Sequence, residues 1–316
     1  MIKKRETKSI RAEYGKTLLE LGKENENIVV LDADLSCSTQ TCVFAKEFPN
    51  RFFNMGIAEQ DMITTAAGLS LTGKIPFVST FSMFASGRAW DQVRNTVCYP
   101  KLNVKIVATH GGITVGEDGA SHQALEDLSI MRSIPNMMVV VPADCAETHE
   151  LIKYAAKYDG PMYIRIARTN VPDVFDRGTY KFDPLKAHII HAGTDITLIT
   201  NGETLAEAMD CLELLKEQGI SAELIHMPVI KPIDKDAIIK SAMKTRKIVT
   251  IENHSIIGGL GSAVCEVLSE NYPTQVLRIG TNDVFGQSGE QRELMDFYGL
   301  TGEKLFQRVI KFLGKQ

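Results

Sequence analysis

The sequence predicts an α/β protein of two domains, each a mostly parallel sheet flanked by helices. Short apolar, β-branched runs alternate with helical patterns along the chain, which is typical of parallel sheets covered on both faces. Strand candidates such as residues 138–141 are continuously apolar, as expected of strands buried on both sides. A chain of 316 residues, of which 44% are hydrophobic, has room for about two such domains.

The first alternation predicts a domain over residues 1–170. Its strand candidates are residues 28–31, 76–80, 104–108, 137–141 and 162–167. Its helical patterns lie at residues 12–23, 57–71, 87–97 and 146–157.

The composition then changes, and a second alternation begins. Residues 171–187 are rich in proline, glycine and aspartate, which indicates a linker. The strands expected after it are residues 196–200, 222–226, 247–251 and 276–279, and the helices are residues 204–218, 235–243, 261–270 and 304–313. Residues 188–316 are therefore expected to form a smaller second domain.

The composition excludes several classes of protein. The net charge is −4 with both signs interspersed, and without a basic stripe nucleic acid is not an expected partner. No apolar run approaches the ~20 residues of a membrane helix, and residues 1–11 lack the apolar region of a secretory signal. The six cysteines are scattered without a C-x-x-C pair, which predicts unpaired thiols in a reducing cytoplasm and no metal site.

The most informative run is Gly-Ile-Ala-Glu-Gln-Asp at residues 56–61, where a helix is expected to begin. Considered alone, Glu59 is a helix-start residue, the third if Gly56 is the N-cap, where a carboxylate suits the free N–H groups. Phe81 and Phe84 follow a strand and, considered alone, are core residues. Their combination with a polar loop further along the chain favours a functional role.

That loop spans residues 110–123 and contains His110, Asp118 and His122. It follows a buried strand, and open α/β sheets bind ligands at the carboxyl ends of their strands, so its side chains are candidates to hold a hydroxylated substrate. Two glycines after the strand predict a turn with close backbone approach. The histidines are twelve residues apart, which argues against a shared metal ion. The alternative is a capped surface turn, in which Asp118 and Ser121 bond backbone N–H groups.

An anion site is expected near Arg168, which follows the strand at residues 162–167. A guanidinium there suits a phosphate or carboxylate. Arg165 is predicted to point to the opposite face of the strand, and either arginine could form a structural ion pair instead. Ser38 and Arg11 are candidates to join the anion site.

A Gly-Gly-Leu-Gly run at residues 258–261 is similar to a dinucleotide-binding loop. The match is poor, because several residues separate the run from the preceding strand and Val264 occupies the position of the third glycine. We interpret the glycines as sites of close helix–strand packing.

Together the motifs resemble transketolase, over its pyrimidine-binding and C-terminal domains, and the resemblance covers nearly the whole chain. It implies thiamine diphosphate as cofactor. Glu59 matches the glutamate that activates the cofactor by a hydrogen bond to its pyrimidine ring. Phe81 and Phe84 match the aromatic pair around that ring, and Asp34 resembles an aspartate near the cofactor. A tyrosine that many transketolases carry three residues after the second phenylalanine is replaced by Gly87.

The resemblance also implies a sugar-phosphate site. Asp118 matches an aspartate that contacts the C2 hydroxyl of the sugar. His122 matches a histidine near its C1 hydroxyl or carbonyl and is, with Glu59, the implied catalytic residue. The residues that match phosphate contacts are His110, Arg168, Ser38 and Arg11.

The chain lacks the Gly-Asp-Gly motif through which thiamine enzymes hold the diphosphate and a divalent ion. The resemblance therefore implies the C-terminal subunit of a split transketolase of the pentose phosphate pathway, which moves a two-carbon ketol unit between phosphorylated sugars. An N-terminal subunit would carry the motif and Mg²⁺ or Ca²⁺, and would share thiamine diphosphate with this chain. Two copies of each subunit are expected.

Three alternatives remain open: a fragment of deoxyxylulose-phosphate synthase, the β subunit of a 2-oxoacid dehydrogenase, and a catalytically silent scaffold subunit. The runs at residues 56–60 and 90–93 are similar to the synthase, which lacks a histidine at the position of His110. His110 and Arg168 favour a phosphorylated sugar over both enzymes, and Glu59 with the polar loop argues against a scaffold.

Overall fold

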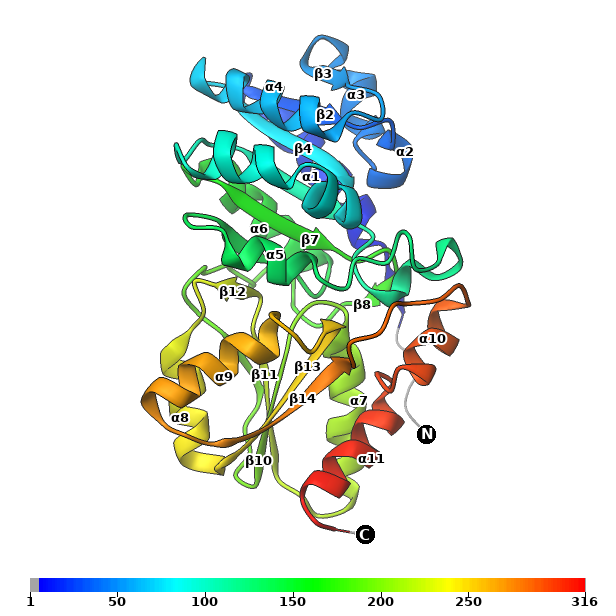
Figure 1. Ribbon diagram of the computed structural model, residues 1–316, viewed down its shortest axis with the longest axis vertical. Helices are drawn as coiled ribbons and strands as arrows, with labels where there is room; N and C mark the ends of the chain where they lie inside the picture. Colours follow the sequence, from blue (N-terminus) through cyan, green and yellow to red (C-terminus); the bar gives the residue numbers. More distant parts are fainter. Residues whose placement is uncertain (1–5, 316) are drawn as a thin grey trace.

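The computed structural model describes residues 6–315 and contains two large sheets, stacked along the long axis of the molecule (Figure 1). Residues 1–5 and 316, which belong to the two predicted domains, lie outside the described part. Within that part, no helix has the length and apolar character that crossing a membrane requires.

The first sheet has seven strands in the order β12-β6-β7-β5-β4-β2-β3, all parallel except β12, which is antiparallel to β6. The five predicted strands all form. The strands are β2 (Ile28–Asp32), β3 (Phe52–Asn54), β4 (Ile75–Phe81), β5 (Lys105–Thr109), β6 (Met138–Val140), β7 (Met162–Ile166) and β12 (Val229–Lys231).

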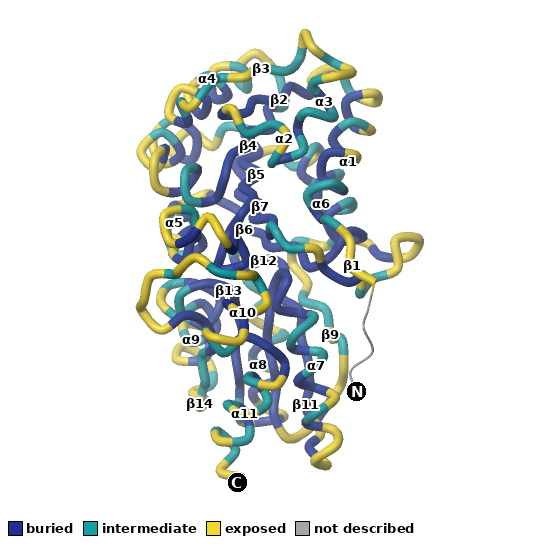
Figure 2. Tube along the Cα trace, turned by 90° about the vertical axis from the view of Figure 1, so that its right-hand side faces the viewer, coloured by how far each residue is buried: buried dark blue, intermediate teal, exposed yellow. Residues whose placement is uncertain are grey.

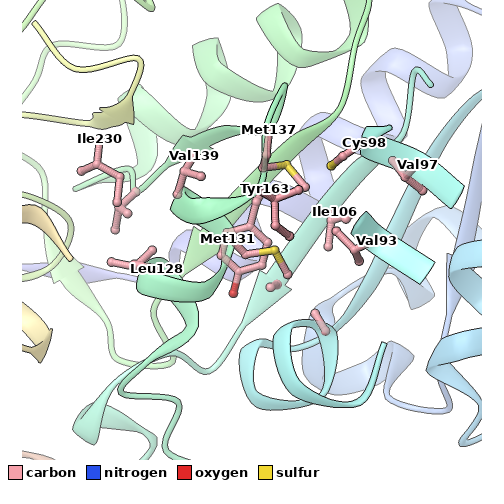
Figure 3. Close-up of a cluster of buried hydrophobic side chains, with 14 of the residues drawn as sticks. Val93, Val97, Cys98, Ile106, Leu128, Met131, Met137, Val139, Tyr163 and Ile230 are labelled. Atoms are coloured by element: carbon pink, nitrogen blue, oxygen red, sulfur yellow. The ribbon is translucent and has the colours of Figure 1, made fainter. Parts of the chain in front are cut away.

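Helices cover both faces of this sheet because successive side chains of each buried strand point to opposite faces and are apolar on both. The helices α1 (Ile10–Glu24) and α6 (Cys145–Lys157) pack together over one face. The other face is covered by α4 (Glu59–Leu71), α5 (Asp127–Ser133) and η3 (Gln92–Cys98). Figure 2 shows the buried strands between partly exposed helices, and Figure 3 shows the core under α5 and η3. Two short helices, α2 (Ser36–Thr39) and α3 (Cys42–Glu47), follow β2.

The second sheet has five strands in the order β14-β13-β10-β11-β9, parallel except for β9. Its strands are β9 (His188–His191), β10 (Ile196–Thr200), β11 (Ala222–His226), β13 (Lys247–Ser255) and β14 (Gln275–Thr281). The helices α7 (Thr204–Glu217), α10 (Gln291–Phe297) and α11 (Gly302–Phe312) share one core, while α8 (Lys235–Thr245) and α9 (Leu260–Asn271) join a core that continues into the first sheet. The four strands and four helices predicted here all form.

The segment predicted as a linker is packed against both halves of the molecule. It begins with β8 (Val171–Pro172), which pairs with β1 (Thr7–Lys8). The Tyr180 hydroxyl donates to Glu147 Oε1 of α6 at 2.5 Å and lies 3.0 Å from Nε2 of His188. The predicted domain boundaries remain a proposal, because β12 returns from the second half to the first sheet, where Ile230 enters the core (Figure 3).

Two local predictions were wrong. The helix expected at residues 87–97 is two π-helical segments, η2 (Phe84–Arg88) and η3. Helix α4 begins at Glu59 with Ala58 as its N-cap, so Glu59 is the first helical residue and not the third. Gly56 instead has a φ of +70° and belongs to the turn before the helix, which a glycine adopts without strain.

Candidate active site

Four of the predicted site residues lie at one edge of the first sheet. The strands β7, β5, β4 and β2 are neighbours, and their carboxyl ends lead to Arg168, His110, Phe81 and Asp34. This edge is where open parallel sheets bind ligands. His110 and Asp34 both have left-handed backbone conformations, with φ of +60° and +63°, which are uncommon outside glycine and often occur at functional sites.

Glu59 is a buried carboxylate with a cationic partner. Its side chain is 1% exposed and accepts hydrogen bonds from Arg88 Nη1 at 2.9 Å on Oε1 and 2.8 Å on Oε2. Thr80 Oγ1 lies 3.4 Å from Oε1. The start of a helix suits this negative charge. Sequence reasoning missed Arg88, although its position four residues after Phe84 places it within one helical turn of the predicted site.

Phe81, Phe84, His110 and His122 form an aromatic cluster beside Glu59. The two phenylalanine rings are nearly parallel, with centroids 5.9 Å apart. His110 stacks on Phe81 at 3.8 Å, and His122 lies edge-on to Phe84 at 5.3 Å. The structure therefore brings both predicted histidines to the predicted aromatic pair.

The environment of His110 strongly disfavours a charged ring. Burial, followed by the positive charges of Arg11 and Arg168 and by His122, lowers the pKa of His110 to about 3. Its Nδ1 lies 2.8 Å from the Thr109 hydroxyl. His110 is thus neutral near pH 7 and can offer one N–H to a ligand.

Arg11 and Arg168 come together at a cavity of about 490 Å³. Arg11 donates from Nη1 to the backbone carbonyl of Ser38 at 2.8 Å and from Nη2 to that of Arg168 at 3.3 Å. Two adjacent guanidinium groups in a cavity suit an anion such as a phosphate. The other lining residues, which include a part of the second domain that sequence reasoning missed, are Thr7, Gly116, Glu117, Thr169, Asn170, Gly289, Glu290 and Gln291.

Arg165 has a different environment from Arg168, as expected from its predicted position on the opposite face of the strand. Its side chain is 3% exposed, its Nε lies 3.0 Å from Asp127 Oδ2, and its Nη2 donates to the Asn253 carbonyl at 2.8 Å. A side chain at Gly111 would lie 2.1 Å from Arg165 Nε, which confirms the predicted close approach at this turn. Arg165 is therefore structural, and Arg168 is the arginine that lines the cavity.

The remaining candidates lie around this group. Asp34 and Asp118 are exposed, and Asp34 Oδ1 accepts from Asn54. Among residues 6–315, no hydrogen bond or ring contact joins either aspartate to Glu59 or the aromatic cluster. Ser38 is half-buried in α2, a turn held by the buried Asp32, which accepts hydrogen bonds from two threonine hydroxyls.

The Glu59–Phe84 site combines a buried carboxylate with an aromatic face, which together suit a flat group that carries hydrogen-bond donors. The guanidinium of Arg88, a flat group with N–H donors, lies 4.4 Å above the Phe84 ring and donates hydrogen bonds to Glu59. A planar group of the protein itself therefore occupies the space between Glu59 and Phe84. Within residues 6–315, no three histidine, cysteine, aspartate or glutamate side chains are grouped so that they could hold a metal ion.

The glycine-rich run at residues 258–261 packs closely against a buried carboxylate. Glu252 fills the start of α9, with its carboxylate oxygens accepting from the backbone N–H groups of Leu260 at 2.7 Å and Gly261 at 2.8 Å. A Cβ at Gly259 would lie 2.1 Å from Glu252 Oε2. The glycines are needed for this close packing, as the sequence predicted.

Two family models match the chain. Residues 6–174 match the family "Transketolase, pyrimidine binding domain" and residues 185–305 match "Transketolase, C-terminal domain". A protein of Methanocaldococcus jannaschii, named provisionally as a transketolase C-terminal section, is 56% identical over 98% of both chains. A 6-deoxy-6-sulfo-D-fructose transketolase subunit of Clostridium sp. (strain MSTE9) is 42% identical over 94% of this chain and 92% of its own.

A solved structure with a TM-score of 0.90 and 52% identity covers 97% of this chain and 98% of its own, and is described as a split-gene transketolase in an inactive β4 tetramer. The chain belongs to the transketolase family.

Proposed function

We propose that this chain is the C-terminal subunit of a split transketolase and transfers a two-carbon ketol unit between phosphorylated sugars together with a separate N-terminal subunit. The observation that carries the proposal is the buried Glu59 beside Phe84, joined through His110 to the arginine-lined cavity. In this proposal, one edge of the sheet combines a pyrimidine site with an anion site.

Each side chain has a distinct role in this proposal. When bound, thiamine diphosphate would supply a nucleophilic thiazolium carbon. Glu59 would hold the pyrimidine ring nitrogen and share a proton with it, because its carboxylate is buried where water does not compete. Phe84 would stack on the ring, and Phe81 supports Phe84 by its nearly parallel contact. Asp34 would lie near the cofactor.

The sugar would lie between the aromatic cluster and the cavity. His122, whose ring contacts the edge of Phe84, would hold the C1 oxygen. Asp118 would bind the C2 hydroxyl. The phosphate of the sugar would be bound by Arg11, Arg168, Ser38 and the neutral His110. The paired arginines favour a phosphorylated sugar over the substrate of a 2-oxoacid dehydrogenase.

The N-terminal partner would provide the Gly-Asp-Gly motif with Mg²⁺ or Ca²⁺, which this sequence lacks. Two relatives support a divided enzyme, since one is named as a C-terminal section and the other as a subunit. We infer an assembly of two copies of each chain. The six unpaired cysteines support the expected cytoplasmic location, and the pentose phosphate pathway is the expected context.

The proposal is tested by reconstitution. The purified chain should show no ketol transfer alone and should gain it with the N-terminal subunit, Mg²⁺ and thiamine diphosphate. Turnover by the chain alone, free of partner, would contradict the division. A scaffold subunit would leave the assembly active after Glu59→Gln.

Under the proposal Glu59→Gln lowers turnover by ~10²–10⁴-fold, the usual size of an acid–base contribution. Exchange of the C2 proton of bound cofactor should slow in parallel. Asp61→Asn is the matched control, because Asp61 lies exposed on the same helical turn.

A further inference from the structure

The buried carboxylate of Glu59 already has an internal partner. Arg88 Nη1 reaches both oxygens, at 2.9 and 2.8 Å, and its guanidinium lies 4.4 Å above the Phe84 ring. The Arg88 side chain itself is 44% exposed, so one end of the pair is buried and the other reaches solvent.

Local structure brings Arg88 to this place. The π-helical turn η2 starts at Phe84 and ends at Arg88, and π-helical turns occur frequently at functional sites. Gln60, the neighbour of Glu59, donates from Nε2 to the Arg88 carbonyl at 3.2 Å and fixes the backbone. Gly87, just before Arg88, is exposed and adds no side chain of its own beside the aromatic cluster.

The guanidinium uses the same two surfaces that a bound pyrimidine ring needs. Both groups are flat, both stack on an aromatic face, and both place a hydrogen-bonding nitrogen against the carboxylate. Arg88 engages both oxygens of Glu59 and covers Phe84, so Arg88 and the ring cannot both occupy this place.

We propose that Arg88 is a displaceable internal ligand of the pyrimidine site. In the cofactor-free chain it pairs with the buried Glu59 charge. When thiamine diphosphate binds, the Arg88 side chain leaves Glu59 and moves to the solvent that it already reaches. This inference rests on the proposed function. Cofactor binding must break the Arg88–Glu59 pair, so the pair lowers the affinity of the site.

The test is calorimetric titration of thiamine diphosphate, with Mg²⁺ present, into the assembly of both subunits. Arg88→Gln removes the competing charge and should tighten binding by about three- to thirtyfold, the range expected for breaking a partly exposed ion pair. Arg94→Gln is the matched control, because it removes a nearby exposed arginine that pairs with Asn95 and not with Glu59. Loss of positive charge alone would weaken binding of an anionic cofactor, so the control should bind equally or less tightly.

Arg88→Lys provides a second variant that keeps the charge but loses the flat guanidinium, and its affinity should lie between those of the unmodified protein and Arg88→Gln. If Arg88→Gln does not assemble, Arg88→Lys carries the same test. Unchanged or weaker binding by the Arg88 variants, with normal binding by the unmodified assembly, would overturn the displacement alone. Absence of binding by the unmodified assembly would overturn the proposed function and the displacement with it.

Discussion

Arg165 lies in strand β7 and Arg168 follows its end, only three residues later. Replacing Arg168 with methionine should weaken substrate binding, whereas replacing Arg165 with methionine should lower the stability of the fold. Arg168 lines the cavity, where its Nη1 donates to the Val115 carbonyl, and among the described residues it forms no ion pair. Arg165 is buried against Asp127. Methionine keeps much of the side-chain volume in both variants and removes the charge.

The expected magnitudes follow from these environments. A charge-assisted contact to a phosphate contributes ~1.5–3 kcal/mol, so Arg168→Met should raise KM for a phosphorylated acceptor about 10- to 150-fold. The effect on an unphosphorylated acceptor should be smaller. Arg165→Met leaves the Asp127 carboxylate buried without its cationic partner, and the loss of one partner of a buried ion pair destabilises a protein by about 3–5 kcal/mol.

Two measurements separate the variants. Steady-state kinetics of the reconstituted assembly across phosphorylated and unphosphorylated sugars gives the KM pattern, and urea unfolding of the isolated chain gives the free energy of unfolding. An equal rise in KM for every sugar with Arg168→Met would refute the phosphate role. A loss of stability as large as that of Arg165→Met would show that Arg168 is structural as well.

Three further predictions concern the loop and the segment between the domains. The unfolded His110 ring binds a proton near pH 6.5 and the folded ring only near pH 3, so its contribution to stability is complete above pH 6.5 and falls by ~1.4 kcal/mol per pH unit below it. His110→Gln should therefore reduce the loss of unfolding free energy per pH unit below pH 6.5, measured by urea unfolding. An unchanged pH dependence would contradict the assignment. Asp118→Ala should reduce the discrimination, measured as kcat/KM, between sugars that differ at C2, while uniform loss for all sugars would argue against hydroxyl recognition. Tyr180→Phe should lower the free energy of unfolding by ~1.5–3 kcal/mol because Glu147 loses a charge-assisted hydrogen bond, and Tyr99→Phe, at an 84% exposed residue, should leave it unchanged.

The regular elements were predictable because their signals are local. Each long strand is a continuous apolar run and each long helix has apolar residues at helical spacing, so their positions depend on short stretches of chain. The candidate residues at the carboxyl ends of strands were predictable for the same reason. His110 and Arg168 each follow a buried strand, and parallel strands bring such positions to one edge.

Features that depend on distant contacts were missed. Strand β12 has only three residues, too few for a recognisable hydrophobic pattern. It forms by antiparallel pairing with β6 of the first sheet. The π-helical winding of η2 and η3 has no sequence signal of its own that separates it from an α-helix. The second-domain residues at the anion cavity, including Gln291, reach it only through the packing of the two halves.

The sequence alone determined the two-domain α/β fold and the likeness to transketolase, and it singled out Glu59 as a candidate. Tertiary structure alone decided the partner of that carboxylate, because the Arg88–Glu59 contact joins residues 29 positions apart. It also decided which of the two arginines near the end of β7 is structural, since burial against Asp127 depends on α5. Hydrophobic pattern is a local property of the chain, whereas charge pairing depends on which distant groups the folded core brings within a few ångströms.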